Sequence, residues 1–423
     1  MKSEPSPILK FLLRATGFFA TCGEELKKIF DFDMAKIYIF LIAGLIIYWF
    51  FRIKRRFVIP GYLSLFLMFV FIHTLITYGL IFRSEFTFAD PRFYTLSNPD
   101  PHVLGVNYEQ PESVGISVLR QFLFILSCYA FCAALQTKKL LLDFVLAYSV
   151  GLSIVIFISL SSFDISVGDR VSGGVADPNA FGFSGAMLAF LATIFIRDSE
   201  VSFLQKLFLS FSLILGIAVV FLSASRGAIL CVGVGFLASL CTSKISFEKI
   251  VLLIFTCVIA IVLLAIVSSQ VKIGGTLIDQ DRYSLNGALA DHGAGRTDIW
   301  HDYLQPVAVK KFLITGVGFG RTVEAIRETY TYELKVTHNN YLGILVNYGI
   351  VGFILFCAAV VQIWNIIQVP TIHGLFVMWL ISGFFLDTFA IRETWIILAI
   401  VCCCVAQRPW LEPGYGDSRL HKS

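Results

Sequence analysis

The sequence predicts an all-α integral membrane protein of about twelve transmembrane helices with one large extracytoplasmic loop. Hydrophobic residues make up 57% of the 423 residues and charged residues only 15%, with a mean hydropathy of +0.80. A soluble domain carries about 25% charged residues. Apolar runs of about 17–25 residues, the length that crosses a bilayer core, recur along the chain. Most of them are apolar on every side, which excludes the surface helices of a soluble protein.

Charge and cysteine usage exclude several classes of protein and site. The formal net charge of +4 is small and no nucleic-acid-binding motif accompanies it, so nucleic acid is not expected as a partner. Nearly all of the ten cysteines lie within apolar runs, which argues against a disulfide framework. No cysteines and histidines are spaced as zinc ligands, and we expect neither a metal site nor a cofactor.

The predicted helices follow one another through mostly short connectors. The first segment, 8–22, is apolar but contains Lys10 and Arg14, and it lacks a clear small-residue cleavage site. We interpret it as a short first span or an interfacial helix. The other spans are expected at 37–51, 57–82, 116–136, 140–162, 180–196, 203–222, 227–241, 250–268, 339–364, 371–388 and 393–407.

Basic connectors predict the topology. The tract 52–56 contains four basic residues and should be cytoplasmic, because basic residues are enriched in cytoplasmic loops. Alternation then places Lys138, the two connectors at 197–206 and 244–249, and the C-terminal tail on the same side. The chain therefore divides into N-terminal membrane helices (1–268), a large extracytoplasmic loop (269–338), and C-terminal membrane helices with a cytoplasmic tail (339–423).

The large loop is too long for an ordinary connector, and such loops are usually functional or disordered. This loop contains a helical pattern of apolar residues within 297–311, which predicts an amphipathic helix. We expect this helix to lie on the membrane surface or to cap a cavity. The residues that share its apolar face are Ile299, Trp300, Tyr303, Leu304 and Val307.

Two arginines are candidate anion ligands on the extracytoplasmic side. Arg226 lies in a minimal turn between two apolar helices, where it is either a snorkelling anchor or a planar fork for phosphate oxygens. Arg296 follows a glycine at the expected start of a helix, and the dipole at that end favours anions rather than cations. Arg296 therefore either binds an anion together with the helix N-terminus or pairs with Asp298 or Asp302.

His338 is the candidate base. A histidine titrates near neutral pH, so it can accept a proton from a hydroxyl group. The alternative is an interfacial histidine, with Asn339 capping the helix that follows. Further along that helix, Gly349 and Gly352 are expected to allow close packing against other helices.

Two other motifs have both structural and functional interpretations. In Asp177-Pro178-Asn179, Pro178 favours a helix start and its neighbours can cap, while the amide of Asn179 also suits a sugar hydroxyl. The glycine-rich segment that ends at Arg321, 316–321, is not a dinucleotide fingerprint, because no strand–helix unit surrounds it. We expect a turn that packs close to the membrane or to another helix.

Taken in order, these motifs resemble the O-antigen ligase and O-antigen polymerase superfamily. The resemblance covers about 170–355, whereas the N-terminal third matches only in hydropathy. The motifs are Asp177-Pro178-Asn179, Ser225-Arg226-Gly227, Gly295-Arg296 with Trp300, Gly316-Val317-Gly318-Phe319-Gly320, His338-Asn339 and Gly349-Ile350-Val351-Gly352.

The resemblance implies a GT-C-like glycosyltransferase of the bacterial inner membrane, with its active site on the periplasmic or outer face. Such an enzyme moves a glycan from undecaprenyl pyrophosphate to a glycan or lipid A core acceptor, without a metal or a nucleotide sugar. Membrane lipids and a chain-length regulator are the other partners implied. By motif match, Arg226 and Arg296 hold the pyrophosphate and His338 is the base, and further substrate contacts are expected from Asn179, Asn339 and Arg321.

Three functions stay open at this point. The segment 337–352 looks more like polymerases, which favours the polymerisation of O-antigen or exopolysaccharide repeat units, with the ligase as the alternative. A lipid-linked glycan flippase or transporter belongs to another class. A transporter is expected to show related halves or broken helices in matching positions, and the sequence shows neither.

Overall fold

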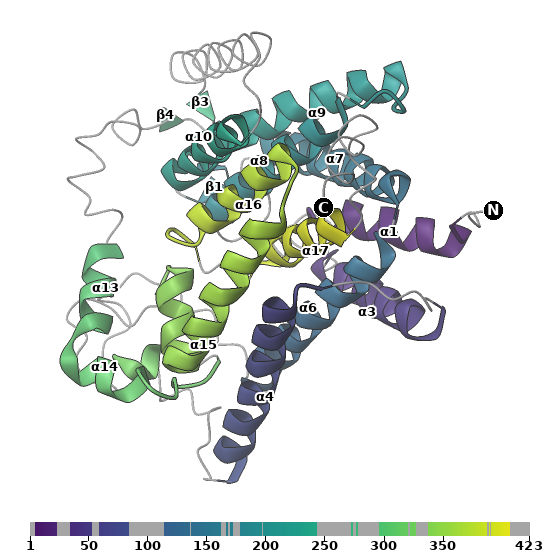
Figure 1. Ribbon diagram of the computed structural model, residues 1–423. Helices are drawn as coiled ribbons and strands as arrows, with labels where there is room; N and C mark the ends of the chain where they lie inside the picture. The colour runs from purple at the N-terminus through teal and green to yellow at the C-terminus, as the bar shows by residue number, and fades with distance from the viewer. Residues whose placement is uncertain are drawn as a thin grey trace, which may run out of the picture.

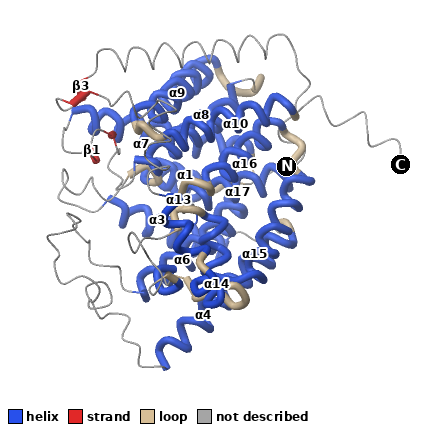
Figure 2. The backbone as a smooth tube through the Cα atoms, turned by 90° about the vertical axis from the view of Figure 1, so that its left-hand side faces the viewer, coloured by secondary structure: helices blue, strands red, loops and turns tan. Residues whose placement is uncertain are grey.

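The computed structural model describes residues 5–22, 34–52, 59–83, 114–135, 137–161, 166–167, 170–171, 178–196, 198–242, 272–273, 276–277, 296–319, 322–326, 337–386, 389 and 391–406. These residues are helical almost throughout, with two short antiparallel ladders (Figure 2). The predicted all-α class is confirmed for them. The expected span at 250–268, most of the loop at 269–338 and the C-terminal tail lie outside the described residues.

The helices come in two groups along the chain. The first group is α1 (Pro7–Phe19), α3 (Met34–Arg52), α4 (Gly61–Arg83), α6 (Val114–Ala134), α7 (Lys138–Ser161), α8 (Pro178–Ile196), α9 (Phe203–Leu222) and α10 (Arg226–Cys241). The second is α13 (Arg296–Leu304), α14 (Pro306–Phe312), the 3-10 helix η3 (Thr322–Ala325), α15 (Asn340–Ile366), α16 (Pro370–Ser382) and α17 (Arg392–Ala406). Strand β1 (Ser166–Val167) pairs with β2 (Arg170–Val171), and β3 (Lys272–Ile273) pairs with β4 (Thr276–Leu277).

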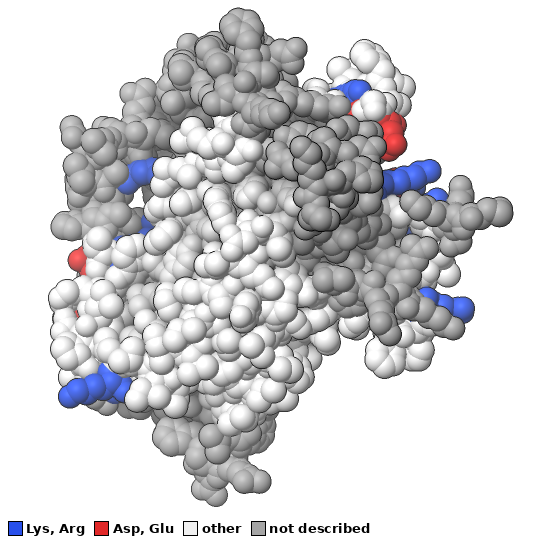
Figure 3. Space-filling model, in the orientation of Figure 1, with Lys and Arg blue, Asp and Glu red and all other residues white. Residues whose placement is uncertain are grey.

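The described helices are those of a membrane protein. Within the described residues, α7, α8, α9 and α15 are long and apolar enough to cross a bilayer, and α4, α6, α10 and α16 contain shorter apolar stretches. Large apolar side chains such as Phe40, Phe157 and Leu207 are exposed on the outside of the bundle. Figure 3 shows one broad face on which charged side chains stand mainly at the margins. Such a surface is suited to lipid rather than water.

Packing between helices gathers their termini at two ends of the bundle. At one end, Ser223 lies against Gly182, because a Cβ atom added to that glycine would be 2.4 Å from the Ser223 hydroxyl oxygen. We call this the Arg226 end, since α10 begins there. At the other end, which we call the Lys138 end, the start of α7 meets the connector between α8 and α9 (Figure 1).

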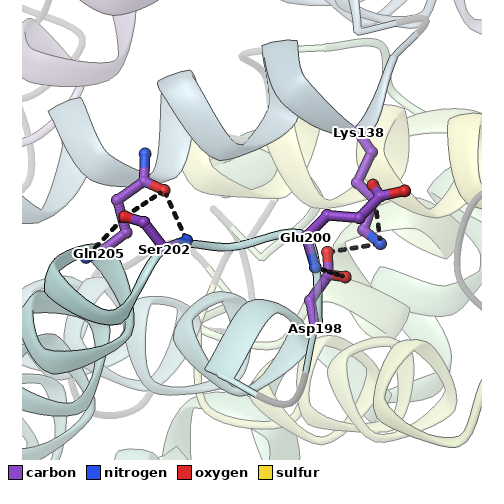
Figure 4. Close-up of polar contacts among 5 residues, drawn as sticks. All are labelled: Lys138, Asp198, Glu200, Ser202 and Gln205. Carbon is purple, nitrogen blue, oxygen red and sulfur yellow. Dashed lines mark hydrogen bonds and ion pairs between the residues drawn. The ribbon is translucent and has the colours of Figure 1, made fainter.

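The Lys138 end is held by polar contacts between connectors that are far apart in the sequence (Figure 4). The Lys138 ammonium pairs with the Asp198 carboxylate and lies 3.7 Å from that of Glu200. Ser202 then caps α9 in a reciprocal capping box with Gln205. Alternation of the spans requires the connectors at Lys138 and at 197–206 to lie on one side, and they do lie together.

Helix α15 is broken at Gly349, which has φ 68° and ψ −172°. Its first nine residues fold back beside the remainder (Figure 1). The ring centroids of Tyr341 and Phe356 are 6.0 Å apart, whereas fifteen residues of unbroken helix extend about 22 Å. The sequence predicted one uninterrupted span at 339–364, and this was wrong because a glycine with positive φ interrupts the helix.

Two other predicted elements are interrupted, whereas several bounds agree closely. The expected span at 371–388 ends at Ser382, the last residue of α16. The turn that follows forms backbone hydrogen bonds with α16 and with the start of α15. The amphipathic helix expected within 297–311 is two helices, because Pro306 cannot continue α13. By contrast, α9 has the predicted bounds of 203–222.

Candidate active site

Arg226 is the first residue of α10 and lies beside the cap of that helix. The Ser225 hydroxyl accepts a hydrogen bond of 3.2 Å from the backbone N–H of Ala228. Ala224, in the tight turn before it, has a φ of +46°. A capped helix N-terminus attracts anions, and the half-buried Arg226 adds a full positive charge there.

Asn179 ties this turn to α8. Its side-chain oxygen accepts a hydrogen bond of 2.9 Å from the hydroxyl of Ser225. Pro178 begins α8, as the sequence predicted. The amide oxygen of Asn179 therefore contacts the cap residue of α10 and does not cap its own helix. This hydrogen bond links the turn before Arg226 to α8.

The turn after α16 connects the start of α10 with the start of α15. A Cβ atom added to Gly227 would lie 3.0 Å from the Phe385 ring. Two residues earlier, the carbonyl oxygen of Gly383 accepts a hydrogen bond of 2.6 Å from the N–H of Asn340. Sequence reasoning missed this turn, since it assigned the segment to the interior of a span. Gly383 was the only local signal of a break.

His338 lies in a tightly held segment at the start of α15. The side-chain oxygen of Asn339 accepts hydrogen bonds of 3.0 Å from the N–H groups of Tyr341 and Leu342, so the predicted cap is confirmed. Thr337, on the other side, is buried, and its hydroxyl donates to the carbonyl oxygen of Asn339 at 3.0 Å. His338 itself has φ +44°, a conformation that costs free energy in a non-glycine residue and is frequent at functional sites.

Helix α13 contacts this segment through Trp300. The indole Nε1 of Trp300 donates a hydrogen bond of 2.9 Å to the carbonyl oxygen of Thr337, the residue before His338. Arg296 precedes Trp300 by four residues, so both lie on the same face of α13. Arg296 is half-buried.

The glycine-rich segment binds the break in α15. The N–H groups of Val317 and Gly318 donate to the carbonyl oxygens of Val346 and Asn347, at 2.8 and 3.0 Å. A Cβ atom on Gly316 would lie 2.3 Å from the carbonyl oxygen of Asn347. The expected turn packed close to another helix is therefore confirmed. Arg321, the last residue of this motif, lies outside the described residues.

A buried acid lies near the Arg226 end and was missed by sequence reasoning. Glu393, in the first turn of α17, is 4% exposed and accepts a hydrogen bond of 2.7 Å from the Ser184 hydroxyl of α8. Its other carboxyl oxygen is buried and has no hydrogen-bond partner among the described residues. Buried acids in membrane helices are costly, so this contact strongly constrains how α8 and α17 pack.

The structure thus joins the segments that carry Arg226, Arg296, His338, Asn179 and Asn339. Contacts run from Asn179 through Ser225 to α10, from α10 through Phe385 and Gly383 to α15, and from α15 through Thr337 to α13. All five residues lie at or next to the N-terminus of a helix. No sequence periodicity signals this convergence, since it arises from packing among α8, α10, α13 and α15.

A family model described as O-antigen ligase matches residues 211–357, which include Arg226, Arg296 and His338. No curated protein matches the chain. The matched range begins within α9, ends within α15 and so contains the whole glycine-rich motif. Over residues 211–357 the chain thus resembles the O-antigen ligase family, and its described apolar helices are those of a membrane protein.

Proposed function

We propose that this protein transfers a glycan from undecaprenyl pyrophosphate to a sugar hydroxyl on the extracytoplasmic face of the plasma membrane. In this proposal the protein polymerises O-antigen or exopolysaccharide repeat units. Arg226 and Arg296 hold the pyrophosphate, and His338 takes the proton from the acceptor hydroxyl. Asn179, Asn339 and Arg321 are proposed as further substrate contacts.

Two cationic groups and one base are a sufficient set for this chemistry. The acceptor hydroxyl oxygen forms a bond to the anomeric carbon as the bond from that carbon to the pyrophosphate oxygen breaks. Guanidinium groups stabilise the negative charge that grows on the leaving pyrophosphate. His338 removes the proton of the hydroxyl during the attack. Attack from the face opposite the leaving group inverts the anomeric centre.

The observation that carries the proposal is the hydrogen bond between Trp300 and Thr337. It links the helix that begins with Arg296 to the residue next to His338, over thirty-seven positions of sequence. A helix that begins with a cation and contacts the segment of a titratable base is suited to a reaction in which a phosphate leaves as a hydroxyl is deprotonated. The match to the O-antigen ligase family supports the same chemistry.

The proposed topology has about twelve spans, with the Lys138 end in the cytoplasm and the Arg226 end outside. The basic tract at 52–56 supports this orientation. Lipid-linked oligosaccharide would then reach Arg226 from the outer leaflet, and the acceptor would approach from the same side.

A ligase that attaches the glycan to the lipid A core is the second candidate, and the printed description of the matching family favours it. A flippase or transporter is the candidate of another class. The break in α15 is a feature of transporters. Here, however, the carbonyl groups at the break accept hydrogen bonds from Val317 and Gly318. The glycine-rich segment therefore occupies the position where a transporter would have an ion path.

Deletion of the gene distinguishes the three candidates. Loss of a polymerase leaves single repeat units on the lipid A core. Loss of a ligase leaves long chains on the lipid carrier, and loss of a flippase leaves repeat units on the inner face of the membrane. Analysis of the glycan on each lipid by mass spectrometry, with the wild-type gene restored on a plasmid as the control, decides between them.

A further inference from the structure

The segment formed by α13 and α14 exposes large apolar side chains besides those that it buries. Its buried side packs in a small core with α15. Leu304, Val307 and Ile314 are 62%, 49% and 73% exposed. A helix in water keeps its exposed face polar, so the apolar side chains exposed within 304–314 are suited to a position between protein and lipid. The buried residues are Ile299, Tyr303, Ala308, Phe312, Ala325, Ile326 and Val346.

The exposed face has the pattern of an interfacial helix. Val307, Lys310 and Ile314 are spaced by three and four residues, which places them in one stripe along α14 and the turn after it. Lys310 is exposed, and its alkyl stem can cover apolar surface while its ammonium reaches phosphate groups. Figure 3 shows basic side chains beside an uncharged surface where Figure 1 places α14.

Contacts with α4 fix the level of this stripe relative to the membrane. His73 Nε2 donates a hydrogen bond of 2.6 Å to the carbonyl oxygen of Thr315, the residue after Ile314. On the same stretch of α4, Ile72 and Ile76 are 47% and 57% exposed, as expected of side chains that face lipid. Ile314 therefore lies at the level of exposed apolar side chains of an apolar helix.

A second contact makes the stripe continuous with the surface of α15. The carbonyl oxygen of Leu313 accepts a hydrogen bond of 2.7 Å from the N–H of Ile350. Ile350, Val351 and Ile354 are exposed on the outside of α15. The apolar surface of one candidate span thus passes without a break onto Leu313 and Ile314.

We propose that the α13–α14 segment is seated in the membrane leaflet at the Arg226 end, with Ile314 and Leu313 among the acyl chains and Lys310 at the phospholipid phosphates. Lipid is favoured over a second protein because the stripe continues surfaces that face lipid and carries a basic residue at its edge. The docking does not depend on the transfer reaction. It would hold α13, and with it Arg296 and Trp300, at the depth of the lipid headgroups.

Spin labels placed on the segment test this docking. The label replaces Ile314→Cys or Val307→Cys, and the matched control is His301→Cys, an exposed residue of α13 that lies outside the stripe. Cys241, Cys257 and Cys357 are replaced by serine in all variants. The full chain is reconstituted in vesicles of phosphatidylethanolamine and phosphatidylglycerol, and collision of each label with oxygen and with a water-soluble nickel chelate is measured.

The labels at positions 314 and 307 should collide with oxygen in preference to nickel, and the label at 301 should show the opposite preference. Nickel collisions at 314 as frequent as those at 301 would place the segment in water and overturn the proposal. A label at 314 shielded from both reagents would mean that protein, such as a second copy of the chain, covers the stripe, which also overturns it. Either result leaves the proposed transfer activity untouched.

Discussion

The indole of Trp300 and the carbonyl oxygen of Thr337 are joined by a hydrogen bond of 2.9 Å. Thr337 is 1% exposed, so this bond forms away from water and determines how α13 meets the start of α15. Through it, the helix that begins with Arg296 is held against the segment that contains His338. The geometry of the proposed site therefore depends on Trp300, although Trp300 takes no part in the chemistry.

Trp300→Phe should lower kcat and leave the KM for lipid-linked donor within about twofold. The ring still packs, but the lost hydrogen bond, worth about 0.5–1.5 kcal/mol, frees α13 to shift. A shift of about 1 Å at a catalytic site costs up to about 100-fold in rate. Trp364→Phe, near the far end of α15, is the matched control and should keep full activity. Equal kcat for both variants in a steady-state assay would contradict the positioning role.

Arg226→Lys and Arg296→Lys should each fail to support normal polymer. Lysine keeps the charge but loses the planar fork that binds two phosphate oxygens at once. Arg14→Lys is the matched control, because Arg14 pairs with Asp143 at the surface and lysine can keep that pair. Glycan length and amount are read on gels beside protein level in the membrane. Full-length glycan from either of the first two variants would make that arginine an anchor only.

His338→Gln should slow single-turnover transfer by about 10²–10⁴-fold while donor binding stays nearly unchanged. Because His338 has φ +44°, a second variant separates its backbone from its base. His338→Asn tolerates that conformation better than glutamine but also cannot accept the proton, so it should be equally slow. His301→Gln, on the surface of α13, is the matched control. Normal turnover by either His338 variant would remove the base role. The next candidates would be the acidic residues that most closely precede His338 in the sequence, Glu324, Glu328 and Glu333.

Gly349→Ala should destabilise the protein by about 1–3 kcal/mol, because alanine is strained at positive φ. The new Cβ atom would also lie 2.3 Å from the carbonyl oxygen of Ile314. Gly233→Ala is the control, since nothing lies within 4 Å of a Cβ atom there. Thermal unfolding in detergent compares the two. An unchanged Tm for Gly349→Ala would show that the break in α15 is not required for stability.

Glu393→Ala should also lower the Tm, whereas Glu393→Gln should restore most of it. Alanine removes the carboxyl acceptor of the buried Ser184 hydroxyl, whose other acceptor is the carbonyl oxygen of Ala180 at 3.1 Å, and the lost hydrogen bond costs about 0.5–1.5 kcal/mol. Glutamine can still accept the hydrogen bond with its amide oxygen. A glutamine variant as unstable as the alanine variant would mean that the negative charge, rather than the hydrogen bond, stabilises the packing of α8 against α17.

The positions of most described helices were predictable, because an apolar run of sufficient length has few alternatives to a membrane helix. The exceptions are breaks within expected helices. The breaks at Gly349 and after Ser382 lie in apolar runs, where hydropathy does not register backbone conformation, whereas Pro306 divides a segment that is not apolar overall. The partners of the backbone hydrogen-bonding groups at each break come from segments that are distant in the sequence. One example is the segment that brings Val317 to Val346.

The sequence by itself determined that this is a helical membrane protein and which superfamily it resembles, and it supplied the candidate residues for holding a pyrophosphate and taking a proton. Those properties follow from residue types and their local spacing. Only the tertiary structure decided that Asn179 contacts the cap of α10 and that Trp300 binds beside His338. The reason is physical: these contacts satisfy polar groups at helix termini, and which terminus lies opposite another depends on how all the helices pack together.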